Sequence, residues 1–439
     1  MSNPYRLEYI HLNKIGVFNN TRIEFPERPS TSNTEHDEQR AEIHLFTGPN
    51  GCGKSTLLYA LANIFHEEDV SKLIQERFHN SESGVNYRFN DSFGEYSIYE
   101  NATKKVFLTI GPDYVQDVIS FSKNNVKNNK IINFLFAVFA YSGQRVIHAA
   151  PITGIQEITN SPFENAVSFD TTIRSHLLLQ WIANNRTKAL IARSENNTAA
   201  AARYDLSQVR ISEFIQEICD LDIKFQMQHF PQLSVKIIVD NKDVPFNTLP
   251  DGLKSILSWT IDLATRLEMI PWEVERDVFT QPMILFLDEI DIHLHPKWQR
   301  RVLPAIQKLL PNAQIFATTH SPFVVGSVAD AWVYRLPEKP DPKAMEQVTI
   351  VGEPSGAGKS YRLILKELFN VEGEFDVETE KLLDAFYLER SAFPNDRSRK
   401  PELQKLAKRI AQISFEAGLI VSQEIRQLER MTGEVIRLA

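Results

Sequence analysis

The chain has 439 residues, of which 43% are apolar and 24% are charged, and its formal net charge at pH 7 is −8. This length suits two or three domains, and this composition is typical of a globular protein with a sizeable core. The acidic balance does not favour a broad nucleic-acid-binding surface, although it is compatible with a local basic patch. The longest apolar run, residues 134–141, is far too short to span a bilayer, so we expect no contact with membranes.

The cysteines and the N-terminus indicate the compartment. The sequence contains two cysteines, Cys52 and Cys219, and the first lies inside a glycine-rich motif. A disulfide is therefore not expected, and the cysteine usage fits a reducing environment. The first residues have no signal-peptide character. We expect a cytoplasmic protein.

A phosphate-binding motif is the strongest signal in the chain. An apolar segment at 43–46 predicts a buried strand, residues 55–62 predict a helix, and between them lies Gly-Pro-Asn-Gly-Cys-Gly-Lys-Ser-Thr at 48–56. This sequence fits the P-loop pattern G-x-x-x-x-G-K-[ST] in the expected strand–loop–helix context. Glycines let backbone N–H groups surround phosphate oxygens, and the helix N-terminus favours the same anion. The expected nucleotide-binding residues are Asn50, Gly51, Gly53, Lys54, Ser55 and Thr56, with Lys54 at the β/γ-phosphates and Ser55 at Mg²⁺.

The next region predicts strands and then helices. Alternating residues at 96–99 and 105–110 predict antiparallel strands beside the nucleotide site. An apolar strand at 134–143 precedes Gln144, which is a candidate Mg²⁺ ligand, although an ordinary turn explains it equally well.

Helices are expected from about residue 145 to 245. Apolar stripes at 173–192 and 206–221 predict two helices, and the Asn- and Ala-rich residues 196–202 predict a mobile or weakly helical linker. No sustained heptads occur between Gln144 and Leu249, so the expectation is a short helical subdomain, with no long coiled coil.

Two further apolar runs end in polar residues. The run at 282–287 predicts a strand buried on both faces, and it ends in Asp288 and Glu289. A carboxylate at this place can hold the Mg²⁺ shell, and its neighbour can act as the general base that activates water. The alternative is that the pair only caps the following turn. The strand at 313–319 ends in His320, which is placed to hydrogen-bond a γ-phosphate.

The chain changes character after about residue 335. Residues 336–360 are rich in proline and glycine and predict a connector. Residues 352–360 resemble a second P-loop, but Glu353 stands where the pattern needs glycine, so nucleotide binding there is not expected. Residues 361–439 predict helices, mainly at 375–393 and 401–438. Their apolar stripe fits either packing on the rest of the chain or a docking surface for a partner or another subunit.

The order P-loop, Leu-Asp-Glu at 287–289 and Thr-Thr-His-Ser-Pro at 318–322 resembles the ATP-binding-cassette (ABC) ATPases. Within them, the form Asp-Glu-Ile-Asp-x-His-Leu-His-Pro at 288–296 and the opening strands at 5–18 look like the soluble branch that contains SMC, RecF and OLD proteins. The resemblance covers roughly residues 3–335. It implies an α/β fold: a 1–335 ABC-type ATPase head, with a mixed sheet around the P-loop, an antiparallel β subdomain and a helical subdomain, followed by a C-terminal helical region.

The resemblance also implies ATP and Mg²⁺ as cofactors and a signature loop that reads the γ-phosphate from the opposite subunit of a dimer. The best match is Leu-Pro-Asp-Gly-Leu-Lys-Ser at 249–255, which makes Gly252 a candidate nucleotide-binding residue in trans. Pro250 replaces the usual serine of this loop, and Ser255 is a candidate to supply the missing hydroxyl.

The segment 360–371 resembles the tail of the PtuA-like ATPases of Septu and retron-linked anti-phage systems. This resemblance implies a homo-oligomeric ATP-hydrolysing sensor that regulates a separately encoded HNH nuclease, with nucleic acid reached through the complex. The alternative is a RecF-like repair ATPase that binds duplex DNA. A nuclease of the OLD type is disfavoured because no Asp-x-Asp triplet follows Pro342, and a transporter subunit is disfavoured because the motif after Glu289 resembles the soluble branch.

Overall fold

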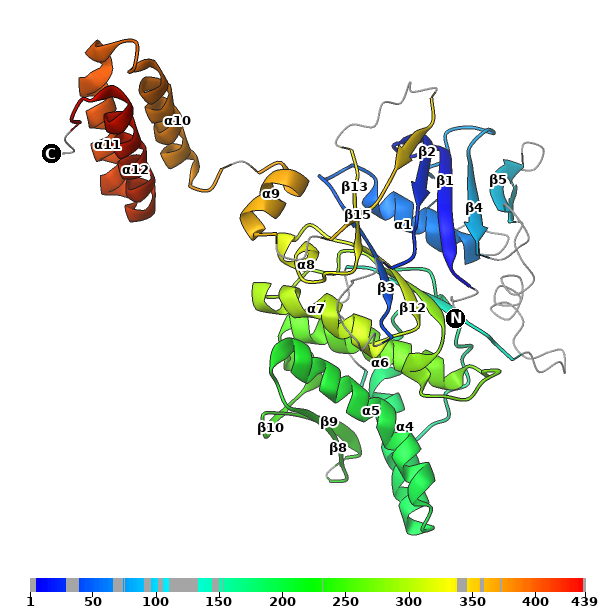
Figure 1. The fold of residues 1–439 in the computed structure, drawn as a ribbon. Helices are drawn as coiled ribbons and strands as arrows, with labels where there is room; N and C mark the ends of the chain where they lie inside the picture. Colours follow the sequence, from blue (N-terminus) through cyan, green and yellow to red (C-terminus); the bar gives the residue numbers. More distant parts are fainter. Residues whose placement is uncertain are drawn as a thin grey trace. The chain divides into compact units, whose positions relative to one another are not determined.

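The computed structural model describes most of the chain. The described residues are 5–28, 39–65, 74, 76–90, 96–101, 106–109, 133–143, 150–152, 154–230, 232–337, 346–355, 359–371 and 373–436. The chain folds into two compact units, residues 1–364 and residues 365–439. Figure 1 labels many of the elements of both units.

A largely parallel sheet forms the centre of the first unit. Its order is β15 (Glu353–Pro354), β13 (Trp332–Arg335), β3 (Glu42–Thr47), β12 (Ala313–Thr318), β11 (Met283–Leu287) and β7 (Ala137–Tyr141). The five strands from β13 to β7 run parallel, and β15 pairs with β13 in the antiparallel sense. Every residue of β7, β11 and β12 is buried, as expected for strands covered on both faces. The strands predicted at 43–46, 282–287 and 313–319 are confirmed.

A second six-stranded sheet holds the N-terminal strands. Its order is β14 (Val348–Ile350), β2 (Phe18–Glu24), β1 (Leu7–Ile15), β4 (Gly84–Phe89), β5 (Tyr96–Asn101) and β6 (Val106–Thr109). The pairs from β2 to β6 are antiparallel, and β14 runs parallel to β2. This sheet confirms the strands predicted at 96–99 and 105–110.

The region between β7 and β11 combines helices with a small sheet. The helices are α4 (Leu178–Ser194), α5 (Thr198–Cys219) and α6 (Asp251–Met269), and the sheet has the order β10 (Lys242–Val244), β9 (Ser234–Val239), β8 (Ile223–Gln228). In Figure 1, α4 and α5 lie side by side in green. The helical subdomain expected at about 145–245 therefore also contains a small sheet, at residues 223–244. Of the mobile or weakly helical linker expected at 196–202, residues 198–202 form the first part of α5. Asn197 caps this helix by accepting a hydrogen bond from the Ala200 N–H, 3.0 Å away.

The other elements that the structure describes in the first unit are helices. They are α1 (Lys54–Ala62), α7 (Pro296–Leu309), α8 (Pro322–Val325) and the first turn of α9 (Tyr361–Phe369), with three short 3₁₀ helices, η1 (Asn63–Phe65), η2 (Phe246–Thr248) and η3 (Val278–Thr280). The Tyr361 ring packs on Phe323 of α8 with 4.9 Å between centroids, which attaches the start of α9 to this unit.

The connector expected at 336–360 contributes to both large sheets. Residues 348–350 pair with β2, and residues 353–354 pair with β13. Glu353, which argued against a second P-loop, lies in β15. The expectation of a plain connector is thus incorrect for residues 348–354, since backbone pairing orders them.

The second unit is a small helical bundle. It contains α10 (Val377–Ala392), η4 (Arg397–Arg399), α11 (Lys400–Ile413) and α12 (Phe415–Thr432). Ser414 has an extended backbone and caps α12 by accepting a hydrogen bond from the Ala417 N–H, so the predicted helical stretch at 401–438 divides there into two helices. The bundle has its own buried core, formed by Leu383, Phe386, Phe393, Leu403, Ala407, Ile410, Ala417, Val421, Ile425, Leu428 and Ile436.

Over the part of the chain that the structure describes, no helix combines the length and the apolar character needed to cross a lipid bilayer.

Candidate nucleotide site

The P-loop connects β3 to α1 with an unusual backbone. Gly48, Gly51 and Gly53 have φ values of 151°, 81° and 98°, which side chains rarely adopt. A Cβ on Gly53 would lie 2.5 Å from Val17 Cγ2 and 2.7 Å from the Phe18 ring. Glycine at position 53 is therefore required both by its conformation and by the close approach of the β1–β2 turn.

Lys54 begins α1 and is 7% exposed. Its ammonium donates hydrogen bonds to the carbonyl oxygens of Gly48 and Pro49, both at 2.9 Å. The amine is thus held across the mouth of the loop, on the side where the first N–H groups of α1 point. No side chain caps α1, so these N–H groups and the lysine together form a cationic site suited to an anion.

Ser55 and Thr56 follow in the first turn of α1 and differ in their surroundings. The Thr56 hydroxyl accepts a hydrogen bond from Arg77 Nε at 3.2 Å, and Thr56 Cγ2 lies 3.0 Å from the position of a Cβ on Gly16. Thr56 therefore joins the start of α1 to neighbouring segments. Ser55 is half-buried at the same helix end.

Asp288 and Glu289 lie at the carboxyl end of β11 and are fixed by one threonine. The Thr318 hydroxyl, at the end of β12, donates to Asp288 Oδ1 at 2.5 Å and accepts from the Glu289 N–H at 2.7 Å. Asp288 is 6% exposed. The Ser55 hydroxyl and the Asp288 carboxylate are hard oxygen donors of the kind that Mg²⁺ prefers together with phosphate oxygens and water, so these residues fit the ion that accompanies ATP.

Glu289 has a φ of 46°, a left-handed backbone that is uncommon outside glycine. Its side chain lies against Gly143, where an added Cβ would be 2.6 Å from Glu289 Cβ and 2.8 Å from Oε2. The end of β7 therefore borders this carboxylate. The candidate ligand Gln144, which follows Gly143, lies outside the described residues.

His320 follows β12 and keeps an exposed side chain. Asp291 Oδ1 accepts from the Thr319 hydroxyl at 2.6 Å and from the His320 N–H at 3.3 Å, which fixes the turn that carries the imidazole. Partial burial and the positive charge of Lys54 lower the pKa of His320, against the opposing charges of Asp291, Glu289 and Asp288. These four charges act on one imidazole, so the ends of β3, β11 and β12 bring the lysine, the carboxylates and the histidine to one place.

Gly252 occupies the first turn of α6. A Cβ there would lie 2.6 Å from the His293 carbonyl oxygen and 3.2 Å from Trp298. The turn that follows Glu289 therefore packs directly on the start of α6, and only glycine allows this contact.

Ser255 does not fit the role suggested for it. Its side chain is 4% exposed, within α6, so its hydroxyl does not face a surface that a second subunit could approach. Pro250 precedes the helix without a side-chain hydrogen bond to it, and Asp251 pairs with Lys254 at 2.8 Å. Gly252 is itself buried in α6, so contact of this helix N-terminus in trans stays a prediction.

Three residues of the site were missed from the sequence: Thr318, Asp291 and Arg77. Thr318 and Asp291 appear within the quoted motifs, where a strand-end threonine and a second acid after Glu289 signalled further polar groups. Arg77 has no local signal, because its contact with Thr56 joins residues 21 positions apart.

A protein-family model matches residues 43–326, more than half of the chain, and it is described as "AAA domain, putative AbiEii toxin, Type IV TA system". The chain belongs to this family. As a member of this AAA-domain family it is an ATPase. The matched region begins in β3 and ends directly after α8, so it includes the P-loop, Asp288, Glu289 and His320.

Several relatives of this AAA-domain protein are named as Septu or retron proteins. It is 24% identical over 418 residues to the Septu protein PtuA of Bacillus mycoides (strain KBAB4). This match covers 91% of this chain and 50% of that protein. It is 23% identical over 298 residues to the Septu protein PtuA of Bacillus thuringiensis, and this match covers 65% of this chain and 68% of that protein. It is 30% identical over 125 residues to the retron Vc95 probable ATPase of Vibrio cholerae serotype O1 biovar El Tor, covering 27% and 24%. The match therefore spans about a quarter of the retron protein and half to two thirds of the PtuA proteins.

Among solved structures, the ATPase is similar to an SMC head bound to the C-winged helix domain of ScpA, with a TM-score of 0.47 and 12% identity over 80% of this chain and 98% of that one. It is also similar to the SMC head domain from Thermotoga maritima, with a TM-score of 0.40 and 14% identity over 80% and 100%.

Proposed function

We propose that this ATPase binds ATP with Mg²⁺ between two copies of itself and acts as the cytoplasmic sensor and regulator of a separately encoded nuclease, of the HNH type, in an anti-phage complex. The observation that carries the ATPase part is the meeting of the P-loop lysine, the Asp288–Glu289 pair and His320 at the carboxyl ends of adjacent parallel strands. The names of the PtuA and retron relatives support the defence part.

Each side chain has a distinct task in this proposal. Lys54 would leave the Gly48 and Pro49 carbonyls and pair with the β/γ-phosphates. Ser55 and Asp288 would hold Mg²⁺, which would neutralise phosphate charge. Glu289 accepts a proton from the attacking water, since Thr318 fixes its backbone at the end of β11. His320, whose pKa is lowered, is neutral at pH 7 and hydrogen-bonds the γ-phosphate.

The second copy completes the site through the N-terminus of α6. Gly252 and the first N–H groups of this helix present a positive dipole end to the γ-phosphate of the other chain. ATP then favours the closed pair because it contacts both copies only in that arrangement, and this differential affinity supplies the switching energy. Residues 361–439 are proposed to carry the partner or oligomer contact.

The test is co-purification of the full chain with the products of its neighbouring genes, followed by DNA cleavage with and without ATP. We expect a nuclease to co-elute and its activity to change with ATP. If no protein co-elutes and duplex DNA accelerates ATP hydrolysis by the isolated chain, the regulator proposal fails and a RecF-like repair function replaces it.

A further inference from the structure

A buried polar cluster lies on the far side of Tyr141 from the carboxylates. Asp262 on α6 is 1% exposed, and its two carboxylate oxygens accept from two arginines: Oδ1 from Arg174 Nε at 3.1 Å and Oδ2 from Arg266 Nε at 2.6 Å. The Tyr141 hydroxyl donates to Oδ2 at 3.0 Å. Asp262, Arg174, Arg266 and Tyr141 are called the α6 cluster below.

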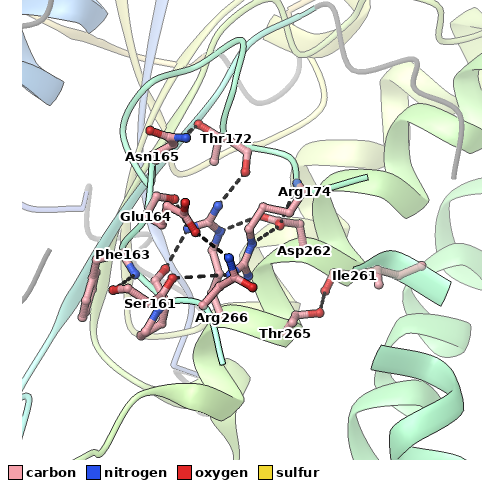
Figure 2. Close-up of polar contacts among 12 residues, drawn as sticks. Ser161, Phe163, Glu164, Asn165, Thr172, Arg174, Ile261, Asp262, Thr265 and Arg266 are labelled. Carbon is pink, nitrogen blue, oxygen red and sulfur yellow. Dashed lines mark hydrogen bonds and ion pairs between the residues drawn. The ribbon is translucent and has the colours of Figure 1, made fainter. Parts of the chain in front are cut away.

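Arg266 ties the cluster to the segment 161–174. Its guanidinium donates to the carbonyl oxygens of Pro162 at 2.7 Å, Glu164 at 2.9 Å and Thr172 at 2.5 Å. Figure 2 shows the dashed bonds that converge on the two arginines from this loop. The planar fork of arginine suits this geometry, and lysine cannot reproduce it.

The cluster is costly to bury. Two guanidinium groups face one carboxylate among its four members, and Arg174 Nη2 is buried without a hydrogen-bond partner. A buried donor left unpaired destabilises the folded state, so packing alone would favour apolar residues here. Because burial of these charged groups destabilises the folded state, we infer that the cluster has another role, which is to fix one arrangement of the elements that it joins.

Tyr141 connects the cluster directly to the nucleotide site. Its carbonyl oxygen accepts from the Asp288 N–H at 2.9 Å, while its hydroxyl reaches Asp262 on α6. One residue thus contacts both the metal-binding strand end and the helix whose first turn carries Gly252.

The segment 161–174 makes a second connection. Phe169 pairs with Tyr141 in an isolated bridge and stacks edge-on against Tyr59 of α1, with 4.7 Å between ring centroids. The P-loop helix, the end of β7 and α6 are therefore joined through one loop and one tyrosine.

We propose that Tyr141, Asp262 and Arg266 are positioning residues that transmit nucleotide occupancy at the P-loop and Asp288 to helix α6, and so set the place of Gly252. The inference rests on the proposed ATP sandwich for its functional meaning. Its physical core, a nucleotide-dependent change in α6 within one chain, is tested without reference to a dimer, a nuclease or hydrolysis.

The experiment uses four variants of the full chain in two matched pairs. Tyr141→Phe removes only the hydroxyl that reaches Asp262, and its control, Tyr334→Phe, removes a hydroxyl from another fully buried tyrosine of the same sheet, bonded to Glu24 O. Arg266→Lys keeps the charge and loses the fork, and its control is Arg6→Lys, where a buried arginine pairs with Glu42 at 2.7 Å.

Amide hydrogen exchange of residues 251–269 is measured with and without Mg²⁺ and a non-hydrolysable ATP analogue. We expect the analogue to slow exchange in the wild-type helix at least threefold. The difference should shrink to less than half in Tyr141→Phe and Arg266→Lys and persist in both controls, while analogue affinity stays within about threefold for all five proteins. In steady-state assays, kcat should fall about tenfold in the two cluster variants with KM nearly unchanged.

Two results overturn the inference: no response of α6 to the analogue in the wild-type chain, or equal losses in cluster and control variants. Tyr141→Phe is the mildest change and keeps the ring, so it reports even if Arg266→Lys does not fold. A wild-type chain whose α6 responds to the analogue but which hydrolyses no ATP would refute the proposed function and leave this inference standing.

Discussion

At the scale of single residues, Glu289 has a strained backbone that neighbouring residues hold in place. Its left-handed backbone costs about 1 to 3 kcal/mol, and such conformations persist where neighbouring contacts enforce them. Here the Thr318 hydroxyl holds the Glu289 N–H, and Gly143 leaves room for the side chain. The carboxylate is therefore aimed by its backbone, which is the property required of a general base.

The Glu289→Gln variant tests that role. The amide keeps the shape but cannot accept the proton, so we expect kcat for ATP hydrolysis to fall by about 10² or more, with ATP affinity retained. Phosphate release and binding of a fluorescent ATP analogue measure the two effects. Glu217→Gln on the exposed face of α5 is the control and should leave both unchanged. Normal turnover by Glu289→Gln would show that another group activates water.

His44 is one residue whose lowered pKa should make stability depend on pH. It is fully buried in β3, between Glu42 at 2.5 Å and the Tyr334 hydroxyl at 2.9 Å, and burial lowers its pKa despite the charge of Glu42. Below the unfolded value of about 6.5, the unfolded chain takes up a proton that the folded chain resists. The free energy of unfolding should therefore fall as pH drops below 6.5, at up to about 1.4 kcal/mol per pH unit.

Urea unfolding at pH 7.5, 6.5 and 5.5 measures this dependence. A His44→Gln chain should show a smaller change over the same window, whatever its absolute stability. The pKa of Glu42 is lowered by His44 and Arg6 in spite of burial, so its contribution is lost only at lower pH, below the usual carboxyl range. A wild-type chain equally stable at pH 7.5 and 5.5 would contradict the assignment.

At the scale of elements, the start of α6 is fixed by contact with a loop. Replacing Gly252 by alanine places a Cβ 2.6 Å from the His293 carbonyl, and neither backbone can yield easily. We expect a loss of about 1 to 3 kcal/mol in unfolding free energy and a lower kcat, because α6 must shift away from the turn after Glu289. Gly154→Ala is the control, since nothing lies within 4 Å of its added Cβ. Denaturant unfolding measures the free energy of unfolding of both variants, and ATPase assays measure their kcat. Equal stability of the two variants would show that the contact between Gly252 and His293 is not as tight as we infer.

The strands that the sequence predicted correctly are those whose burial in the sheet is visible in their own residues. The strands at 43–46, 282–287 and 313–319 lie in a sheet covered on both faces, so apolar residues dominate them, with His44 and Gln314 as buried polar exceptions. Strands β8 and β9 were missed because each is half-exposed and lies between strong helices. Residues 348–351 look strand-like in the sequence, but the pairing of residues 348–350 and 353–354 could not be predicted, because their partner strands lie about 330 and 20 positions away.

The candidate site also contains some residues that the sequence predicted and others that it could not place. Motif spacing predicted Lys54, Asp288, Glu289 and His320, which fall at the ends of neighbouring strands. It could not place Arg77 on Thr56, nor show that Ser255 is buried, because these depend on how α1 and α6 pack against other segments.

At the scale of the whole molecule, the two compact units suggest a separation of tasks. Every described residue of the candidate site precedes residue 321, and the unit 365–439 has a core of its own. We expect a chain ending at residue 372 to bind and hydrolyse ATP within about threefold of the full chain, because a unit with its own core folds independently. It should lose co-purification with the nuclease if residues 361–439 carry the partner contact. Loss of ATP binding on truncation would show that the second unit supports the site.

The short segment 346–355 has a mechanical consequence. Within seven residues it lays one strand on the antiparallel sheet and one on the parallel sheet, and Ser355 then bonds to the backbone of Ala331. The segment thus links the two sheets, because moving one sheet past the other would break the pairing of a strand with its neighbour. We expect this link to limit movement between the two sheets, so that the helices packed on them would take up the movement that ATP drives.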